Sequence, residues 1–509
     1  MLATVYSSSV IGIDAYTVEV EVDISRGLPA FSTVGLAEGA VRESKERVKA
    51  ALKNSGYHFP ADRITVNLAP ADVKKEGSGF DLPIAVGILT ATGLIPPTAL
   101  KGHLIMGELS LDGSVRPIKG ALSIAIMAKE FKLQGMFLPS ENAAEAAVVD
   151  GIAVYPINSL SQLVQSLNGI EPIGSFEIET DPIKDQIDFD IDFSDVCGQE
   201  NVKRAVEIAA AGGHNVLMIG PPGAGKTMLA QRLATIMPGL TFEEALETSK
   251  VYSVMGLMPR GQGLIPRRPF RSPHHTISDA GLIGGGVIPK PGEVSLAHNG
   301  VLFLDEMPEF RKNVLEVLRQ PMETGIVTIS RANSTVTYPA NFVLVGAMNP
   351  CPCGFFGDEK RECTCSYREI QRYRAKISGP LMDRIDIHID VPSVPFKDLT
   401  GVGQGEPSSH IHQRVLAAKR IQEKRLHKTK IHSNAMMNTR QIKKFCEIGD
   451  RSNSLLEKAM EKFGLSARAL SRILKISRTI ADLAGAQSIE TAHVAEAIQY
   501  RTFDRKLII

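Results

Sequence analysis

The sequence predicts an α/β protein in three parts: a mixed α/β N-terminal domain, a middle domain on a parallel sheet, and a C-terminal helical domain. Strand-like and helix-like segments mix over residues 1–170. From about residue 194, short apolar strands alternate with helices, the pattern of βαβ units. Beyond residue 410 the pattern is helical. Because one hydrophobic core rarely exceeds about 250 residues, a chain of 509 residues requires more than one domain.

The N-terminal domain is predicted from local patterns. VEVEVDIS alternates like a half-buried strand, and ITVNLAP reads as another. Residues 38–54 have helical periodicity, and FDLPIAVGILTATG reads as an apolar helix. GELSLDGSVRPI predicts a hairpin that turns at Asp112 and Gly113.

Two breaks divide the chain. Residues 171–193 are acidic, contain two prolines and show no helical stripe, so they are predicted to be a linker. TGVGQGEPSSH, residues 400–410, is rich in Gly and Ser. The predicted parts are 1–170, the linker 171–193, a core 194–400 with an insert at about 251–295, and a helical domain 401–509.

The composition limits the class of protein. Apolar content is 43% and charged content 22%, as in a globular chain with several cores. The net charge is +1, so contact with nucleic acid would depend on local patches. Aromatic content is 6% without Trp, which disfavours an aromatic stacking platform. Apolar runs are short and broken, and no basic leader begins the chain, so we expect a cytoplasmic protein without a membrane partner.

A glycine-rich loop is the strongest chemical signal. GPPGAGKTM follows an apolar strand and precedes a helical run, the context that a phosphate-binding loop requires. Its backbone N–H groups would surround phosphates, Lys226 would neutralise their charge, and the Thr227 hydroxyl would bind Mg²⁺. The predicted ATP-binding residues are Gly220, Pro221, Pro222, Gly223, Ala224, Gly225, Lys226, Thr227 and Met228.

Polar residues end two further apolar strands. VLFLDE places Asp305 and Glu306 at a strand end, where Asp305 can hold Mg²⁺ and Glu306 can orient the attacking water. NFVLVGAMN ends at Asn349, whose amide can contact the γ-phosphate, although a simple turn before Pro350 is the alternative.

Basic residues form two further candidate sites. Arg384 either reaches a neighbouring subunit's nucleotide or pairs with Asp383 or Asp386. Residues 260–275 carry arginines and histidines for sequence-independent DNA contact, with a solvated loop or a set of ion pairs between subunits as the alternatives. The DNA candidates are Arg260, Arg267, Arg268 and Arg271, with His274 and His275 beside them. The basic run 412–430 is interpreted as a solvated helix.

GPPGAGKT, VLFLDE, the strand ending at Asn349 and LMDRIDIHIDV resemble an AAA+ ATPase. RPFRSPHHTISDAGLIGGGVIPKPGEVSLAHNG, NPCPCG and SARALSRILKISRTIADL resemble the magnesium-chelatase-like branch, and within it the YifB/ComM family. The resemblance implies a hexameric, ATP-driven ring, and DNA branch migration during natural transformation. It also implies roles: Walker A for residues 220–227, Walker B for Asp305 and Glu306, and sensor 1 for Asn349. Arg384 would be the arginine finger and Arg468 sensor 2, with Arg472 as the alternative.

The N-terminal domain resembles the proteolytic domain of Lon, an S5 domain 2-like α/β fold. Lon-type catalysis needs a serine beside a lysine of lowered pKa. Gly79, Phe80 and Asp81 lie near the expected serine position, and Leu122 occupies the lysine position. Ser78 and Lys119 are offset, so we expect no peptidase activity.

Four of the six cysteines cluster in NPCPCGFFGDEKRECTCS. Cys351, Cys353, Cys363 and Cys365 could form a tetrahedral Zn²⁺ site, although Cys-x-Cys is tighter than the usual Cys-x₂-Cys. Reduced buried thiols or a disulfide pair are the alternatives.

Two functions share these features. The first is an ATP-driven DNA motor that acts on single-stranded and branched DNA. The second is a chaperone or chelatase-type remodelling ATPase that acts on protein. The basic segment favours the first. A nucleotide-switched binding module is disfavoured, because Glu306 provides for hydrolysis.

Overall fold

The structure is a computed structural model that describes residues 1–36, 39–71, 75, 77–178, 189–287, 289–331, 334–358, 361–394, 405–427, 429 and 431–501. The chain divides into two compact units, Met1–Ile183 with Phe242–Pro266, and Lys184–Thr241 with Arg267–Ile509. The first unit therefore includes a segment from the middle of the chain. The predicted boundaries near residues 171–193 and 400 fall partly on 179–188 and 395–404, which lie outside the described residues.

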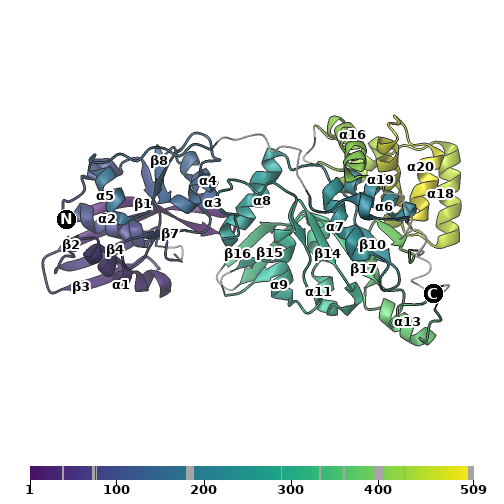
Figure 1. The fold of residues 1–509 in the computed structure, drawn as a ribbon, viewed down its shortest axis with the longest axis horizontal. Helices are drawn as coiled ribbons and strands as arrows, with labels where there is room; N and C mark the ends of the chain where they lie inside the picture. Colours follow the sequence, from purple (N-terminus) through teal and green to yellow (C-terminus); the bar gives the residue numbers. More distant parts are fainter. Residues whose placement is uncertain are drawn as a thin grey trace. The chain divides into compact units, whose positions relative to one another are not determined.

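The first unit is built on a seven-stranded sheet in the order β3-β4-β2-β1-β5-β8-β9 (Figure 1). Strands β1, β2 and β4 pair antiparallel, whereas β5, β8 and β9 continue from β1 in parallel. The strands are β1 (Leu2–Ile11), β2 (Asp14–Ser25), β3 (Ala30–Val34), β4 (Arg63–Ala69), β5 (His103–Ile105), β8 (Gly135–Pro139) and β9 (Ala153–Ile157). The helices are α1 (Gly39–Asn54), α2 (Asp81–Ala91), α3 (Ala121–Glu130), α4 (Ala143–Ala146), α5 (Leu160–Leu167) and α8 (Phe242–Met255).

The local patterns explain these elements. Val18, Val20 and Val22 of β2 are fully buried, whereas Glu19 between them is exposed. Every residue of α2 is buried, as expected of a helix that is apolar on all sides, and α2 packs on β1 and β2. The predicted hairpin is confirmed: β6 (Glu108–Leu109) pairs with β7 (Val115–Arg116).

Helix α8 is fixed within the first unit by polar contacts. Its Ser253 hydroxyl donates to the buried Glu145 carboxylate, and Lys250 pairs with Asp14 at 2.6 Å. The Ser249 hydroxyl accepts from the N–H of Ile265 at 2.8 Å, which closes the segment after the helix. These contacts explain why the segment groups with the N-terminal sheet.

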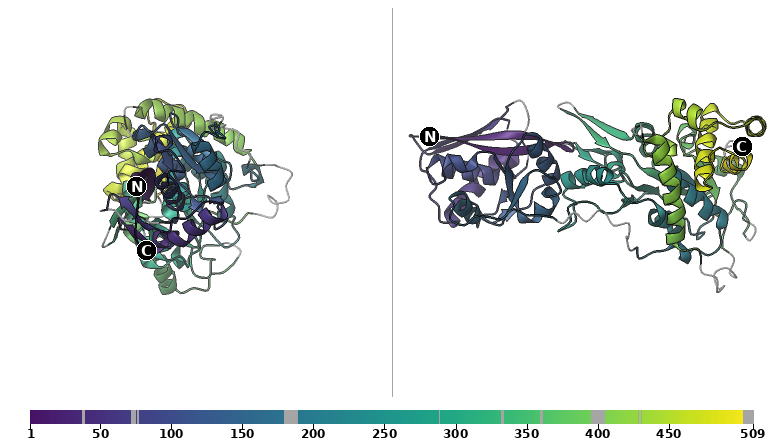
Figure 2. Two further views of the ribbon diagram at one scale, coloured as in Figure 1. Left: turned by 90° about the vertical axis from the view of Figure 1, so that its left-hand side faces the viewer. Right: turned by 90° about the horizontal axis from the view of Figure 1, so that it is seen from above.

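The second unit contains a five-stranded parallel sheet in the order β11-β14-β17-β10-β18 (Figure 1). Figure 2 shows the ribbon from two further directions. Its strands are β11 (Phe270–Arg271), β14 (Val301–Leu304), β17 (Val343–Met348), β10 (Val216–Ile219) and β18 (Ile387–Asp390). Strands β10, β14 and β17 are buried throughout, as expected of parallel strands covered on both faces. Because all strands are parallel, the residues after β10, β14 and β17 meet at one edge.

Helices cover this sheet, and further helices form the C-terminal region, which is coloured from green to yellow in Figure 1. The flanking helices are α6 (Glu200–Gly212), α7 (Lys226–Ile236), α9 (Asp279–Ile283), α10 (Glu293–Leu296), α11 (Lys312–Glu316), α12 (Arg319–Thr324), α13 (Tyr367–Arg374) and α14 (Gly379–Met382). The C-terminal helices are α16 (Ser408–Leu426), α17 (Thr439–Phe445), α18 (Asp450–Phe463), α19 (Ala467–Leu483) and α20 (Thr491–Gln499). A hairpin of β15 (Ile326–Arg331) and β16 (Ser334–Pro339), a two-stranded ladder of β12 (Gly284–Gly285) and β13 (Lys290–Pro291), and short 3₁₀ turns complete the unit. The predicted fold class, an α/β chain with a parallel-sheet core and a helical C-terminal region, is confirmed.

Buried charges join the C-terminal helices to the sheet. The Asp386 carboxylate accepts from His214 at 3.3 Å and from Arg472 of α19. Burial alone would raise the pKa of Asp386, but Arg472 and His214 hold it well below its usual range. Further along α19, Asp482 pairs with Arg425 and Arg478. The basic helix α16 was interpreted as solvated, but its Arg425 pairs with the buried Asp482 of α19.

Candidate active site

The phosphate loop connects β10 to α7. Its glycines have backbone conformations or close contacts that a residue with a Cβ would fit poorly. Gly223 has φ 78° and Gly225 has φ 86°, both left-handed. A Cβ on Gly220 would lie 2.2 Å from the carbonyl oxygen of Val391. The loop therefore turns tightly and presents its backbone at the start of α7, as a phosphate cradle requires.

Lys226 lies at the centre of the site. Its ammonium group donates to the carbonyl oxygens of Gly220 and Pro221 at 2.6 and 2.9 Å, and to Asn349 Oδ1 at 3.2 Å. Burial lowers the pKa of Lys226, although the carboxylates of Asp305 and Glu306 oppose this effect. The structure thus brings together Walker A and Asn349, which are 123 positions apart along the chain.

Thr227 and Asp305 provide oxygen ligands for a hard cation. The Thr227 hydroxyl donates to Asp305 Oδ2 at 2.8 Å, and Asp305 Oδ1 accepts from the N–H of Glu306 at 2.9 Å. A hydroxyl and a carboxylate beside a phosphate cradle match the oxygen ligands that Mg²⁺ takes with nucleotide phosphates. The residues present fit Mg²⁺ and a nucleoside triphosphate.

Glu306 has an unusual backbone conformation just after β14. Its φ is 49°, in the left-handed region that non-glycine residues rarely adopt, and its side chain is 56% exposed. His275 Nδ1 lies 3.6 Å from Glu306 Oε2, and its ring meets Phe310 edge-on. Sequence reasoning placed His275 only in the basic segment. The structure places it four residues after the two-residue strand β11, which no sequence pattern predicted.

The two other arginines predicted for the nucleotide site do not take part in the hydrogen bonds described above for the phosphate loop. Arg384 is buried, pairs with Glu323 and donates to the carbonyl oxygen of Pro380 at 2.5 Å, while its Nε has no hydrogen-bond partner. Its partner is thus neither Asp383 nor Asp386. Arg468 is exposed on the first turn of α19, and the alternative, Arg472, is engaged by Asp386.

The four arginines proposed for DNA contact differ in their surroundings. Arg260 belongs to the first unit and Arg267 to the second, and both are exposed. Arg268 donates to three backbone carbonyl oxygens, those of Pro238, Gly239 and Asn299. Arg271 forms a two-bonded ion pair with Glu293 at 2.6 and 2.7 Å. The last two arginines therefore stabilise the second unit itself.

The four clustered cysteines converge in the loop after β17. Their sulfur atoms all lie within 4.8 Å of one another. The N–H of Phe355 lowers the pKa of Cys353 to about 5, although desolvation opposes it. The N–H of Cys353 would lower the pKa of Cys365, but desolvation and the neighbouring sulfurs raise it to about 12. One thiolate therefore disfavours the next when no cation is present.

The two candidate protease residues of the first unit have different surroundings. The Ser78 hydroxyl donates to Glu108, and Lys119 is exposed. Asp81 is buried and pairs with Arg47 at 2.7 Å, and its burial raises its pKa to about 6 although Arg47 opposes the shift. The described geometry thus gives Ser78 a carboxylate partner where Lon-type chemistry needs a lysine.

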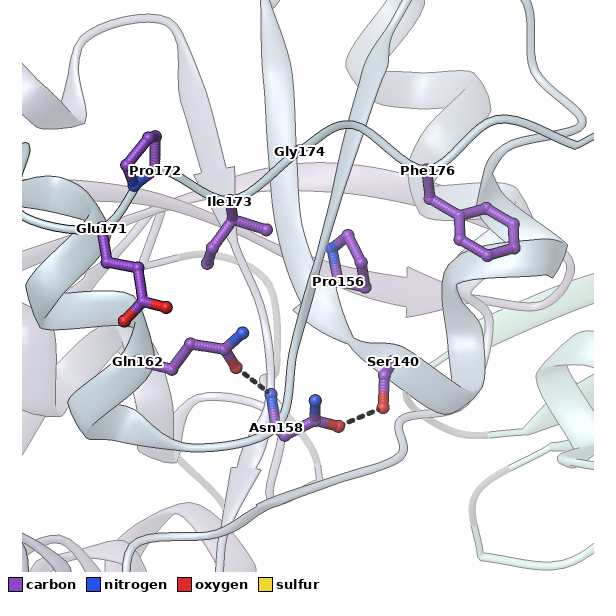
Figure 3. A pocket seen from close by; sticks show the side chains of 9 residues that line it. All are labelled: Ser140, Pro156, Asn158, Gln162, Glu171, Pro172, Ile173, Gly174 and Phe176. Atoms are coloured by element: carbon purple, nitrogen blue, oxygen red, sulfur yellow. Dashed lines mark hydrogen bonds between the residues drawn. The ribbon is translucent and has the colours of Figure 1, made fainter.

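A cavity of the same unit lies beside β9 and α5 (Figure 3). The N–H of Asn158 donates to Gln162 Oε1 at 2.8 Å, and its side chain accepts from Ser140. Among the nine described residues that line this cavity, Glu171 is the one charged residue, so the lining offers no cation for a phosphate.

None of the helices in the described parts of the chain has the length and apolarity to cross a bilayer.

The sequence matches known families and proteins along almost all of its length. The family models described as "Magnesium chelatase, subunit ChlI", "Subunit ChlI of Mg-chelatase" and "Magnesium chelatase, subunit ChlI C-terminal" match residues 192–399, 20–142 and 405–501. Competence protein ComM of Haemophilus influenzae is 45% identical over 99% of this chain and 98% of its own length. Protein YifB of Escherichia coli is 42% identical over 100% of this chain and 98% of its own. The magnesium-chelatase 38 kDa subunit of Rhodobacter capsulatus is 27% identical over 31% of this chain and 50% of its own.

Proposed function

Because the chain belongs to the ComM and YifB family of magnesium-chelatase-like AAA+ proteins, we propose that it is a ring-forming, ATP-driven DNA motor, a branch-migration helicase. The contact between Lys226 and Asn349 at the common strand edge supports the nucleotide part of this proposal. The relative's name, a competence protein, supports a role in strand integration during natural transformation, in the cytoplasm.

The residues of the second unit divide the chemistry of ATP hydrolysis among them. Lys226 and the loop N–H groups hold the β and γ phosphates, and Thr227 and Asp305 would hold Mg²⁺. Bound there, Mg²⁺ would neutralise phosphate charge. Glu306 orients the attacking water, and Asn349 contacts the γ-phosphate. In a hexamer, Arg384 of one subunit would leave Glu323 and reach its neighbour's nucleotide, while Arg468 would act from its own helical region.

We expect His275 to position Glu306. Replacing it, His275→Ala, removes the ring within 3.6 Å of that carboxylate, and ATP hydrolysis should fall about tenfold, or about 1.4 kcal/mol, with ATP affinity unchanged. Steady-state hydrolysis and nucleotide titration measure the two effects. His427→Ala, at an exposed position directly after α16, is the matched control. Equal losses in both variants would contradict a specific role for His275.

DNA contact is proposed for the exposed arginines, with phosphates as the chemical target. The segment that begins with Arg267 continues through β11 to His275, so it reaches the hydrolysis site directly. DNA held by this segment could therefore affect Glu306 through His275.

The test is ATP hydrolysis with and without single-stranded and branched DNA over a range of salt concentrations. We expect DNA to stimulate ATP hydrolysis by the wild type. The double variant Arg260→Gln and Arg267→Gln should reduce by about two the slope of the logarithm of DNA affinity against the logarithm of salt concentration. Basal hydrolysis should stay unchanged. Arg451→Gln, at an exposed position of α18, is the control. Absence of stimulation by any DNA would favour the remodelling ATPase that acts on protein.

A further inference from the structure

The cysteine cluster has the shape of a site for a single ion. Cys351 Sγ lies 3.3 Å from Cys353 Sγ and 3.6 Å from Cys363 Sγ, and Cys353 Sγ lies 3.6 Å from Cys363 Sγ. Four sulfurs about 2.3 Å from one Zn²⁺ would lie about 3.8 Å apart at the corners of a tetrahedron. The observed separations are close to this value, and all fall within 4.8 Å. A disulfide would require about 2 Å between two sulfurs.

Backbone N–H groups donate to two of the sulfurs. The N–H of Cys353 donates to Cys365 Sγ and that of Phe356 to Cys351 Sγ, both at 3.3 Å. Two of the four sulfurs thus accept a backbone hydrogen bond. Such bonds orient metal-bound thiolates and reduce their charge, whereas neutral thiols in a packed core do not require them.

The cluster is also attached to the nucleotide site. It begins two residues after Asn349, the side chain that accepts from Lys226. A Cβ on Gly354 would lie 2.6 Å from Pro222 Cδ, so the cysteine loop rests directly on the phosphate loop. Arg374 of α13 donates to the carbonyl oxygen of Pro350 at 3.2 Å and lies over the Phe356 ring.

We propose that Cys351, Cys353, Cys363 and Cys365 bind one structural Zn²⁺, which holds the loop after β17 against the phosphate loop and so fixes Asn349. The proposal has two parts. The metal site stands on the sulfur geometry alone, whereas its effect on hydrolysis rests on the proposed ATPase function.

Elemental analysis of the purified full chain tests the first part. We expect about one zinc per chain in the wild type and in Cys197→Ser and Cys446→Ser, the two cysteines outside the cluster. Cys353→Ser and Cys363→Ser should lose the metal. Co²⁺ bound to the wild-type chain after zinc removal should show the intense visible absorption of a tetrahedral thiolate site. Iron as the stoichiometric metal, or a wild-type chain that binds neither zinc nor cobalt, would overturn the assignment.

The second part is tested on the wild-type chain, which avoids variants that fail to fold. A thiol-reactive mercurial is used to remove the zinc and is then itself removed with excess thiol. The zinc-free chain should hydrolyse ATP about tenfold more slowly, and return of zinc should restore the rate. Lys226→Ala should keep its zinc and hydrolyse no ATP. Full hydrolysis by the zinc-free chain would overturn the proposed coupling. An inactive wild type with one zinc would instead refute the ATPase proposal.

Discussion

Glu306→Gln is expected to lower ATP hydrolysis by about 100-fold or more while the affinity for ATP stays close to that of the wild type. Glutamine keeps the size of the side chain but removes the charge that orients and polarises the attacking water. The residues proposed to hold phosphate and cation, Lys226, Thr227 and Asp305, keep their contacts. Steady-state phosphate release and a nucleotide-binding titration measure the two quantities separately.

Glu309→Gln is the matched control for this substitution. Glu309 lies three residues further on, and its carboxylate pairs with Lys376 at 3.0 Å on the surface. Its loss should change hydrolysis by less than about threefold, since exposed ion pairs contribute little. Hydrolysis by Glu306→Gln within a few-fold of the wild type would exclude Glu306 as the residue that orients water.

Asp482→Ala is expected to destabilise the C-terminal helices by about 3–5 kcal/mol, because it leaves buried guanidinium groups without their counter-charge. The Asp482 side chain has no exposed surface and accepts from Arg425, Arg478 and Asn434. These bonds tie α19 to α16 and to the turn before α17. Removing the carboxylate therefore leaves Arg478, which is 4% exposed, without its ion-pair partner.

The chain lacks Trp, so a single Trp introduced at Phe463 of α18 can report on these helices alone. In this background, urea unfolding followed by Trp fluorescence should shift to lower urea for Asp482→Ala. Glu457→Ala, at an exposed position of α18, should stay within about 0.5 kcal/mol of the parent. A shift for Asp482→Ala no larger than that of Glu457→Ala would show that the buried pairs contribute little to stability.

The parallel-sheet core was predictable because its signals are local. A four-residue apolar strand, a glycine-rich loop and a polar strand end each have a sequence pattern, and parallel strands bring their carboxyl ends to one edge. Asn349 was predicted by this reasoning, and its contact with Lys226 lies where the strand order places it.

Contacts between distant segments were not predictable. Ser253 and Glu145 are 108 positions apart, and no local pattern indicates that Phe242–Pro266 joins the N-terminal sheet. Arg384 has acidic neighbours in sequence, yet its ion-pair partner is Glu323 of α12. The approach of Gly354 to Pro222 likewise depends on the packing of two loops.

In the proposed function, this chain converts ATP hydrolysis into movement of DNA strands. Its most direct test is branch migration on a synthetic three-strand junction with labelled strands, ATP and Mg²⁺. The wild type should convert the junction to exchanged products, and Glu306→Gln, which still binds ATP, should not. Strand exchange at equal rates by both proteins, or by neither while the wild type hydrolyses ATP, would contradict the claim.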